Sequence, residues 1–396
     1  MKVLVTASER FAITKDGHLW SAKATLDYYQ WAGYLEVYDE VYLMGRAKLH
    51  PNPPLGWVKT TGPGVKAVPV PYFVGPWEYI KNYRGVKSVA EKAVAEAEAF
   101  QLRIPCTIGA AVYDCLTPQR PFGIEVIADP YDSFAPGSVK HPLRPFFRWW
   151  FPRQLRRKCS DATAALYVTK EALQRRYPCR HYSVGVSDAE LPQEMLVSTS
   201  RPVNPGLRKF TLIQVGTLAQ LYKAPDVLIA AIAVCVQNGL DLKLVLIGDG
   251  KYRTQLEQQA KNLGISERVH FCGQLSSRDA VRDQLDQADL FVLPSHQEGL
   301  PKAMVEAMGR ALPVIGSTVG GIPELLPPED MVSPGDVAAL ANKIREVVND
   351  PQRMAQMSAR NLEKAKEYTK AVLRGQRLAF YRYVREKTEV WLKQQR

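Results

Sequence analysis

Two glutamates, Glu298 and Glu306, stand on either side of a proline in a segment that is otherwise mostly apolar. The apolar run 290–293 before them is typical of a buried parallel strand, and Pro301 is well placed to begin a helix. Glu306 then falls among apolar helical residues, where an unpaired carboxylate is costly unless it reaches solvent or serves a polar ligand. The segment therefore predicts a site for a polar ligand at the end of a strand.

The residues between the two glutamates have the features of a diphosphate site. A helix that begins at Pro301 leaves its first backbone N–H groups unpaired, and Gly299 lets a phosphate approach them closely. The positive end of the helix dipole adds attraction. A carboxylate does not serve a phosphate, but it accepts hydrogen bonds from vicinal hydroxyls, so Glu306 is assigned to a ribose and Glu298 to a sugar. The predicted donor-binding residues here are Glu298, Gly299, Leu300, Pro301, Lys302 and Glu306.

Composition restricts the class of protein. With 396 residues, 46% of them apolar and 23% charged, the sequence is of ordinary globular type and long enough for two domains. It contains no apolar run that could cross a bilayer, and residues 1–7 have the pattern of a strand rather than of a signal peptide. The six cysteines form no Cys-x-x-Cys pair, which favours reduced cytoplasmic thiols over a disulfide framework or a zinc site.

The net charge of +12 implies an anionic partner. The sequence shows no zinc-finger spacing, ribonucleoprotein motif or helix-turn-helix, which argues against nucleic acid. Phosphorylated small molecules and an anionic membrane surface remain. Residues 143–158 interleave six basic with five aromatic side chains. That pattern fits either peripheral contact with an anionic membrane or a crossover helix whose aromatic residues pack inside its domain.

The first half of the sequence, to about residue 187, alternates short strands with helical or irregular stretches. This alternation favours a parallel sheet covered on both faces. A helix rich in Ala and Glu is predicted over 89–101. The predicted strands are 2–7, 36–44, 66–72, 123–128, 164–169 and 181–186.

The acceptor side of a site would lie in this half. Residues 8–21 are predicted to form a loop at the carboxyl end of the first strand, where open α/β sheets bind ligands. Asp16, Gly17 and His18 in that loop are predicted acceptor-side residues. Asp129, at the end of a buried strand, is predicted to point into an interdomain cleft as an acceptor-side and catalytic residue. For each of them a purely structural role fits the pattern equally well.

Residues 189–205, rich in Pro, Ser and Asn, are predicted to be a linker, and a more regular β/α alternation after it describes a second doubly wound domain. A long basic helix, 371–395, is expected to lie back against the first domain. The predicted division is 1–190 joined by about 371–396 as the acceptor-binding domain, and 206–368 as the donor-binding domain. The elements predicted in the second domain are strands 210–216, 242–247, 269–272, 290–293 and 313–316, and helices 225–238, 252–263, 279–287, 337–348 and 352–368.

Several motifs of the second half occur in a specific order: Ser295-x-x-Glu298-Gly299-Leu300-Pro301, Glu306-Ala307-Met308, 312–315 and 319–324. In this order and spacing, over about 210–324, they resemble the family-4 (group 1) retaining glycosyltransferases. The first half is only loosely similar. The resemblance implies the GT-B fold, an α/β architecture of two Rossmann-like doubly wound domains facing each other across a cleft. It also implies that Glu298 and Glu306 are the family's E-x7-E pair.

The resemblance identifies Lys223 with the family's lysine on the diphosphate. The usual pattern is Gly-Arg-Leu and, after three residues, Lys-Gly. Here Thr217 replaces the arginine, one residue is inserted before Lys223, and Ala224 replaces the glycine. One of the two usual cations is therefore missing, so that Lys223 works with the helix amides alone or with another base such as Lys302 or Arg10.

Further donor residues lie in the loops after two strands. Asp249 is predicted to cap the helix that follows it, and its loop could also line the nucleotide pocket. Glu324 is predicted to support the donor site. The donor-binding residues predicted outside the 298–306 segment are Gly216, Thr217, Lys223, Gly248 and Gly250.

The resemblance implies retaining transfer of a hexosyl unit from a UDP- or GDP-sugar to a saccharide or polyprenyl-linked acceptor. Cell-surface polysaccharide biosynthesis, in the cytoplasm or at the inner face of the plasma membrane, is the expected setting. Glu298, Lys223 and Asp129 are the predicted catalytic residues. Because no pair of carboxylates is placed to act across the bond, a front-face reaction that stabilises charge on the diphosphate is expected. No Asp-x-Asp motif is present, so no metal ion or other cofactor is expected.

Three alternatives stay open. One is another GT-B enzyme, such as a nucleotide-sugar epimerase or a phosphorylase. A second is a catalytically silent partner subunit that keeps the fold. The third, a dinucleotide-dependent oxidoreductase, is disfavoured because no Gly-x-Gly-x-x-Gly follows the first strand.

Overall fold

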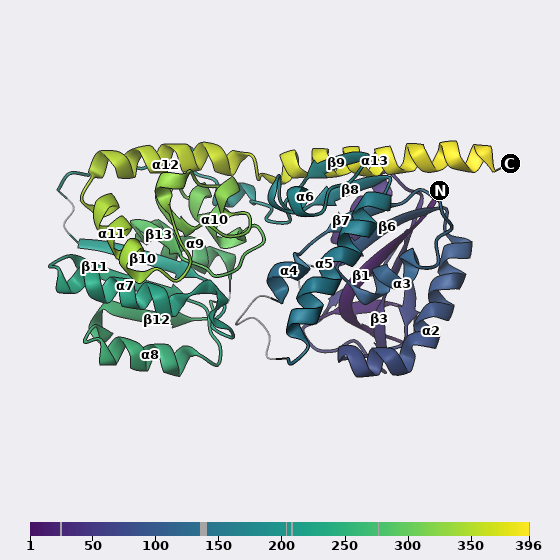
Figure 1. Cartoon of the computed structure of the whole chain (residues 1–396), viewed down its shortest axis with the longest axis horizontal. Helices are drawn as coiled ribbons and strands as arrows, with labels where there is room; N and C mark the ends of the chain where they lie inside the picture. Colours follow the sequence, from purple (N-terminus) through teal and green to yellow (C-terminus); the bar gives the residue numbers. More distant parts are fainter. Residues whose placement is uncertain (24–25, 135–140, 203, 207–208, 276, 396) are drawn as a thin grey trace. The chain divides into compact units, whose positions relative to one another are not determined.

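The computed structural model describes the chain apart from residues 24–25, 135–140, 203, 207–208, 276 and 396. The chain divides into two compact units, Met1–Val186 with Arg374–Arg396, and Ser187–Leu373. Each unit is built on its own largely parallel sheet with helices packed on it (Figure 1). The predicted α/β class with two doubly wound sheets is confirmed.

The sheet of the first unit has β1 at its centre. Its parallel strands run in the order β5–β3–β1–β6–β7–β8–β9, and the short antiparallel strands β2 and β4 add to the far end of β1. Val3, Leu4 and Val5 are fully buried, as expected for a strand covered on both faces. The strands are β1 (Lys2–Ile13), β2 (Leu19–Ser21), β3 (Glu40–Leu49), β4 (Val58–Lys59), β5 (Val65–Val70), β6 (Ala99–Ile104), β7 (Gly123–Val126), β8 (Ala164–Tyr167) and β9 (Tyr182–Gly185).

Two predictions for this unit are wrong. The helix predicted over 89–101 is α2 (Gly75–Glu96), and its predicted last residues belong to β6, which pairs with β1. The loop predicted from Ser8 begins later, because β1 continues to Ile13 alongside β3 after a register shift between Thr6 and Arg10. The other helices are α1 (Tyr28–Ala32), α3 (Thr107–Tyr113), α4 (Pro130–Ser133), α5 (Arg144–Asp161) and α6 (Ala172–Arg176), with a 3-10 helix at Gly33–Glu36 shortly before β3.

The C-terminal helix α13 (Lys370–Gln394) belongs to the first unit from Arg374 on. It buries Tyr381, whose ring stacks on Tyr34 with centroids 4.4 Å apart. Both hydroxyls donate to Glu125 Oε1 on β7, and the Arg103 guanidinium lies 3.4 Å from Oε2 of the same carboxylate. A buried charge is tolerated when it is paired and hydrogen-bonded in this way. This network fixes α13 to the sheet.

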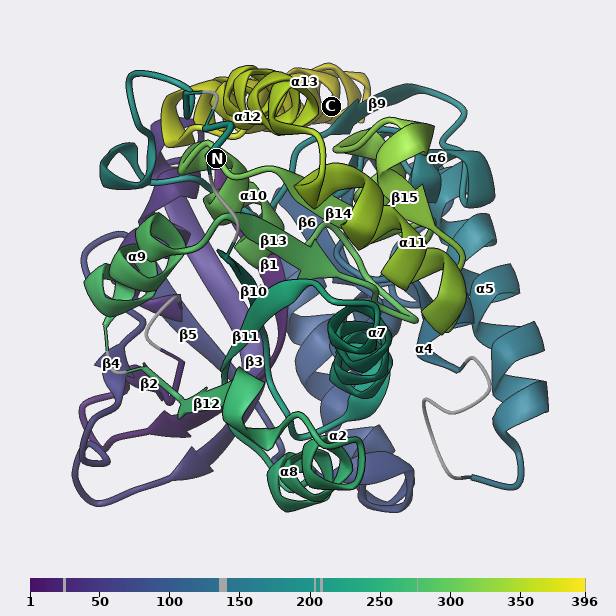
Figure 2. The ribbon, with the colours of Figure 1, turned by 90° about the vertical axis from the view of Figure 1, so that its left-hand side faces the viewer.

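The sheet of the second unit is fully parallel, in the order β12–β11–β10–β13–β14–β15. Chain order along this sheet is 3-2-1-4-5-6, the doubly wound order whose direction reverses between the first and fourth strands. Figure 2 shows α7, α8 and α11 on one face of the sheet and α9, α10 and α12 on the other. The strands are β10 (Lys209–Val215), β11 (Asp241–Ile247), β12 (Val269–Gly273), β13 (Leu290–Leu293), β14 (Val314–Ser317) and β15 (Met331–Val332).

The helices of this unit follow the predicted pattern closely, and only the short strand β15 was not predicted. α7 is almost wholly apolar because the sheet, α8 and α11 surround it. Its N-cap, Ala224, has a left-handed backbone with φ of 51° at the position where the family pattern has glycine. The helices are α7 (Pro225–Gln237), α8 (Arg253–Asn262), α9 (Arg278–Gln287), α10 (Lys302–Gly309), α11 (Val337–Val348) and α12 (Pro351–Lys366).

Candidate donor site

The predicted donor residues of the second unit gather where its strand order reverses. β10 and β13 are neighbours, with Leu212 opposite Leu290, so the loops that follow them emerge side by side. The His296 N–H donates to the Tyr222 carbonyl at 2.7 Å and joins these two loops directly. Open α/β sheets bind ligands in the crevice at such a switch point. The topology thus brings together two segments that are far apart in the sequence.

Lys223 and Glu298 meet across this junction. Lys223 Nζ lies 2.8 Å and 3.0 Å from the two carboxylate oxygens of Glu298. The Ser295 hydroxyl donates to Glu298 Oε1 at 2.7 Å. Only 15% of the Lys223 side chain and 6% of the Glu298 side chain are exposed, so the pair is largely desolvated. A ligand that carries both phosphate and hydroxyl groups can replace this pairing, with the phosphate on the lysine and the hydroxyls donating to the carboxylate.

The backbone around Lys223 leaves its side chain little freedom. A methyl group on Gly216 would lie 3.1–3.3 Å from the Lys223 chain, so glycine there lets the lysine pass. The Gln214 amide donates to the Lys223 carbonyl at 2.7 Å. The ammonium therefore has a preset position at the end of β10.

Glu306 lies in the middle of α10, between apolar residues that are buried against the sheet. It is itself buried, and its nearest cation, Lys302 Nζ, is 4.0 Å from Oε1. Burial raises the pKa of the Glu306 carboxyl above its ordinary value, against the opposing charges of Lys302 and Arg278. A carboxylate kept in this environment without a close partner is available to a hydroxyl ligand.

Two glycines that follow β14, Gly320 and Gly321, approach the backbone of the loop before α10 closely. A methyl group on Gly320, where φ is +54°, would lie 2.0 Å from the Glu298 carbonyl oxygen. The Gly321 N–H donates to the Gly299 carbonyl at 2.6 Å. Pro301 is the N-cap of α10 rather than its first residue, so the helix begins at Lys302, one residue later than predicted. As at any helix start, the first N–H groups of α10 have no partner within the helix.

Gly248 and Gly250 form a second close backbone approach beside β10. Their φ angles are +133° and +156°, which side chains rarely adopt. A methyl group on Gly248 would lie 1.9 Å from the Gly216 carbonyl oxygen, and one on Gly250 would lie 2.1 Å from the Ala219 nitrogen. Both glycines therefore let the loop after β11 touch the loop that carries Lys223.

Replacing Gly248 by alanine is expected to lower the free energy of unfolding by about 4 kcal/mol, because it adds a backbone clash to left-handed strain. The Gly239→Ala variant is the matched control. Gly239 also has a positive φ, +87°, but nothing lies within 4 Å of an added methyl group, so about 1 kcal/mol is expected. Urea denaturation of both variants measures the difference, and equal losses would contradict the close approach.

The structure corrects the prediction for Asp249 and shows what the Thr217 side chain does. Asp249 does not cap α8, whose N-cap is Tyr252. Its carboxylate instead accepts from the Gly250 N–H and lies 3.4 Å from Arg253. Thr217, which replaces the family arginine, accepts from the Ala219 N–H at 3.1 Å and so stabilises the turn before Lys223.

The acceptor-side residues predicted in the first unit form local structures of their own. Asp16, Gly17 and His18 make the tight turn between β1 and β2. Asp16 accepts from the Thr14 hydroxyl and the His18 N–H, which lowers the pKa of the Asp16 carboxyl. His18 Nδ1 lies 3.1 Å from the Thr61 hydroxyl. These polar atoms serve the hairpin, and their assignment to an acceptor stays a prediction.

Asp129 has a full set of protein partners. Its carboxylate caps α4 by accepting from the Tyr131 N–H at 2.8 Å. It also pairs with Arg176 and accepts from the Tyr177 hydroxyl. These contacts account for the residue structurally, and its assignment to the acceptor and to catalysis stays a prediction.

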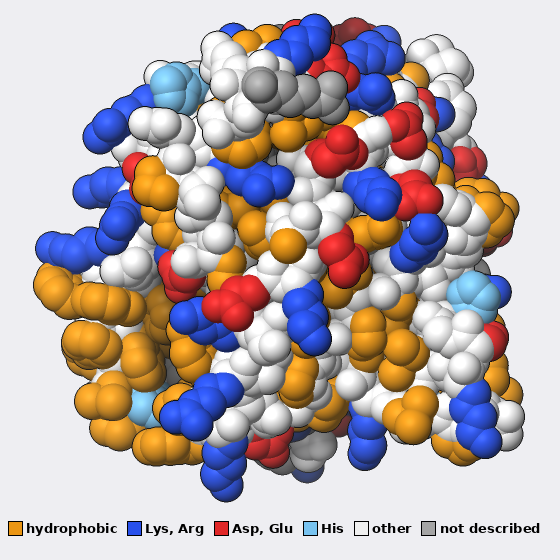
Figure 3. All heavy atoms as spheres, turned by 90° about the vertical axis from the view of Figure 1, so that its right-hand side faces the viewer, with side chains coloured by type: hydrophobic (Ala, Val, Ile, Leu, Met, Phe, Trp, Pro, Cys, Tyr) orange, Lys and Arg blue, Asp and Glu red, His pale blue; other side chains and the backbone are white. Residues whose placement is uncertain are grey.

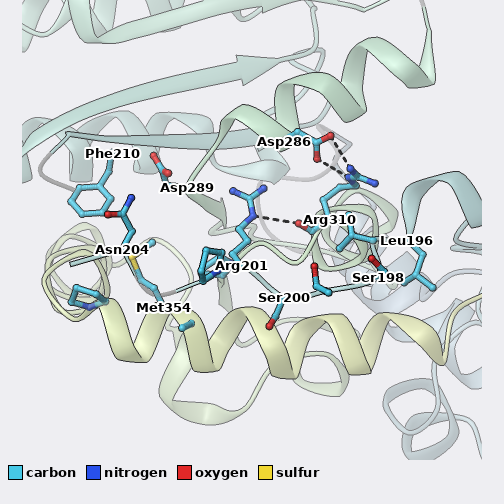
Figure 4. Close-up of a pocket in the computed structure, with 16 residues that line it drawn as sticks. Leu196, Ser198, Ser200, Arg201, Asn204, Phe210, Asp286, Asp289, Arg310 and Met354 are labelled. Carbon is cyan, nitrogen blue, oxygen red and sulfur yellow. Dashed lines mark hydrogen bonds and ion pairs between the residues drawn. The ribbon is translucent and has the colours of Figure 1, made fainter. Parts of the chain in front are cut away.

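A cavity of 770 Å³ lies away from the donor residues, between the segment 196–204, α12 and the end of α9 (Figure 4). A half-buried cation of its wall, Arg201, donates to the carbonyls of Leu285, Ala288 and Arg310. Arg310 in turn makes a two-point ion pair with Asp286 at 2.7 Å and 2.8 Å. Both guanidinium groups are thus occupied, and the cavity wall fixes the extended segment to the second unit.

The Arg201→Ala variant is expected to lose about 3 kcal/mol of unfolding free energy, because three carbonyls lose their donor in a partly buried place. Asn204→Ala is the control, since Asn204 is exposed in the same segment and its loss is expected to stay within about 0.5 kcal/mol. Urea denaturation of the two variants tests the role of Arg201. A small effect of Arg201→Ala would show that the segment is held mainly by apolar contacts.

Sequence reasoning missed the supporting residues of both units. The motif that contains Ser295 does not predict its hydrogen bond to Glu298, and Arg176, Tyr177 and Arg201 have no local sequence signal. Within the described ranges, His, Cys, Asp and Glu side chains form no group of three that could hold a metal ion. Among the described helices, none combines the length and the apolar character needed to cross a bilayer.

Residues 199–364 match the family model described as Glycosyl transferases group 1. Protein CapJ from Staphylococcus aureus is 24% identical over 330 residues, which are 81% of each chain. The family match coincides with the unit that carries Lys223, Glu298 and Glu306.

Solved structures with the same fold cover almost the whole chain. HepE from Anabaena, solved with UDP and glucose, has a TM-score of 0.63 and 18% identity over 96% of this chain and 98% of its own. The lipopolysaccharide outer core galactosyltransferase WaaB has a TM-score of 0.65 and 14% identity over the same shares. The predicted GT-B fold is therefore confirmed.

Proposed function

We propose that this chain, which belongs to the group 1 glycosyltransferases, transfers a hexosyl unit from a nucleotide-diphosphate sugar with retention of the anomeric configuration. The observation that carries the proposal is the desolvated Lys223–Glu298 pair at the switch point, on the loop that leads to the buried Glu306. The glycosyltransferase class is established by the family match. The donor contacts, the stereochemistry and the acceptor are our proposal.

Four groups are assigned to the donor. Lys223 and the first N–H groups of α10 bind the diphosphate, since both supply positive charge at one junction. Glu306 accepts hydrogen bonds from the ribose hydroxyls, and Glu298 accepts them from the transferred sugar. The binding of UDP or GDP is compatible with these contacts because none of them involves the base.

The chemistry follows from the charge that grows on the leaving diphosphate. As the bond to the anomeric carbon breaks, Lys223 and the α10 amides stabilise the negative charge from preset positions. Glu298 is the carboxylate beside Lys223, and its ion pair and the Ser295 hydrogen bond hold it in place. We propose a front-face substitution in which the departing phosphate takes the proton of the acceptor hydroxyl.

The proposed acceptor is a saccharide or a polyprenyl-linked saccharide, in cell-surface polysaccharide assembly at the cytoplasmic side of the membrane. WaaB, which by its name acts on the lipopolysaccharide outer core, supports this setting. The reaction is proposed to need no metal ion, since Lys223 and the helix amides provide the positive charge.

A calorimetric screen of UDP, GDP and NAD tests the proposal. We expect micromolar binding of one diphosphate nucleotide, about 10 µM or tighter, no binding of NAD, and no change when EDTA replaces Mg²⁺. Loss of binding in EDTA would overturn the metal-free contacts. Failure of both UDP and GDP to bind would overturn the donor site.

One observation favours a second function, that of a catalytically silent partner subunit. Thr217 stands where the family has a cation and uses its hydroxyl to stabilise the loop instead. Incubation with radiolabelled sugar nucleotides separates the two. Slow release of labelled sugar supports an enzyme, whereas binding without any turnover supports the silent subunit.

A further inference from the structure

Helix α5 carries an exposed row of aromatic side chains. Phe146, Trp149 and Trp150 have relative exposures of 49%, 48% and 42%, and they follow the spacing i, i+3, i+4 of one helix face. Their rings contact one another, with centroids 5.9–6.0 Å apart. Phe151, 41% exposed, adjoins this row. Phe147 and Phe151 contact Phe134. In the part of the chain that the structure describes, none of the five aromatic residues of α5 belongs to the buried core.

The opposite face of α5 fixes the helix to the first unit. Leu155 and Cys159 are buried in the core of that unit. Pro152 lies inside the helix without interrupting it. The crossover interpretation, in which the aromatic residues pack inward, is therefore wrong for Phe146, Trp149 and Trp150. Four half-exposed rings present about 400 Å² of apolar surface, and patches of this size on a monomer mark interaction sites.

Basic side chains surround this row. From Leu143 to Ser160 the sequence contains no acidic residue. The Arg153 guanidinium lies 4.4 Å from the Trp149 ring centroid, and Arg144 has no acidic partner among the described residues. Figure 3 shows hydrophobic side chains gathered at the lower left of this face, with Lys and Arg side chains beside them.

We propose that the exposed row of α5, Phe146, Trp149, Trp150 and Phe151 with Arg144 and Arg153, docks on the surface of an anionic bilayer. Aromatic rings insert at the depth of the headgroups, and arginines pair with lipid phosphates. No described helix is suited to span a membrane, so the contact is peripheral.

Charge complementarity selects the bilayer over a second copy of the chain. The patch is basic throughout and the whole chain carries +12, so two copies repel each other at this surface. An anionic bilayer offers both features at once, negative charge and an apolar layer just beneath it. Docking on a bilayer rests in part on the proposed function, because a lipid-linked acceptor would lie in that bilayer. Vesicle binding is measured without donor or acceptor, so membrane docking and glycosyl transfer can each fail without the other.

Flotation with phosphatidylcholine vesicles, with and without phosphatidylglycerol, tests the proposal. We expect binding to the vesicles that contain phosphatidylglycerol and a decrease with added salt. Arg144→Gln/Arg153→Gln is expected to weaken binding at least tenfold, about fivefold for each arginine. Trp149→Ser/Trp150→Ser is expected to weaken it at least as much. No binding of the wild-type chain at low salt would overturn the proposal.

Control variants remove exposed groups of the same kinds elsewhere in the first unit. Tyr29→Ser removes an aromatic residue that is 80% exposed, and Arg382→Gln/Lys393→Gln removes two exposed charges of α13. Both are expected to leave vesicle binding unchanged. Equal losses in control and test variants would overturn the assignment to α5. So would self-association that depends on Trp149 and Trp150 while vesicles fail to bind.

Quenching by brominated lipids places the aromatic row directly. Vesicles with bromine on the upper acyl chain are expected to quench tryptophan emission of the wild-type chain. Trp149→Phe/Trp150→Phe is expected to bind within about twofold of wild type, because the rings stay apolar, and to lose most of the quenching. Unchanged quenching in this variant would show that other tryptophans meet the lipid and would overturn the proposal.

Discussion

Glu306→Gln is expected to lower kcat/KM for sugar transfer by about 100-fold or more, because two charge-assisted hydrogen bonds to ribose hydroxyls become weak neutral ones. The same change is expected to leave the free energy of unfolding equal or slightly higher, since it removes a desolvated charge whose nearest cation is 4.0 Å away. Transfer assays and urea denaturation of one variant measure both effects. A residue that serves the fold would show the reverse pattern, with lost stability and retained activity.

Glu329→Gln is the control for the Glu306 assay, because Glu329 is an exposed glutamate of the same unit. It is expected to change neither stability nor transfer. Nucleotide affinity of Glu306→Gln, measured by calorimetry, separates binding from chemistry. A loss in affinity for the free nucleoside diphosphate supports the ribose contact, whereas a loss in transfer alone would place Glu306 nearer the reacting sugar and contradict our assignment.

The raised pKa of the Glu306 carboxyl adds a pH signature. Between the ordinary pKa of 4.5 and the raised folded-state pKa, the folded protein keeps a proton that the unfolded chain has released. This group therefore makes the unfolding free energy fall as the pH rises through that window. Glu306→Gln lacks the group, so its stability relative to wild type is expected to rise with pH there. Wild-type nucleotide affinity is expected to rise over the same window, as the carboxylate becomes charged.

The segment that carries the proposed donor residues Glu298 and Glu306 could be predicted because its signal is local. Glu298, Pro301 and Glu306 lie within one strand-loop-helix segment, and the period of the apolar residues places that segment correctly. The order of the strands in the sheet has no comparable local pattern in the sequence. The contact between Lys223 and Glu298, 75 residues apart, exists only because β10 and β13 are neighbours in the sheet.

The first unit was harder to predict because some of its polar residues have partners that are far away in the sequence. β6 follows a helix rich in Ala and Glu without a strong break, and its polar Gln101 hides the pattern of a buried strand. In the folded chain the Gln101 amide donates to the Tyr38 hydroxyl at 3.1 Å, so its nitrogen has a hydrogen-bond partner inside the core. Asp129 likewise resembled a site residue because its partners, Arg176 and Tyr177, come 47 and 48 residues later. Long-range pairing explains the error over β6 and the contacts of Asp129 that its local sequence does not indicate.

Lys223→Met is expected to abolish transfer, with a loss in kcat of about 1,000-fold, because the diphosphate loses its preset cation. The variant is also expected to lose about 3 kcal/mol of unfolding free energy, since it leaves the buried Glu298 carboxylate without its partner. These two losses have different causes, and a second substitution separates them.

The double variant Lys223→Met/Glu298→Gln removes the stranded charge along with the lysine. It is expected to regain most of the stability lost by Lys223→Met, because a neutral amide still accepts from the Ser295 hydroxyl and needs no cation. It is expected to stay inactive, since neither the diphosphate nor the sugar is held. Urea denaturation and transfer assays of wild type, both single variants and the double variant complete a thermodynamic cycle. If the double variant regains stability but not activity, the two residues serve donor binding rather than folding. If the losses in unfolding free energy are additive, Lys223 and Glu298 do not interact.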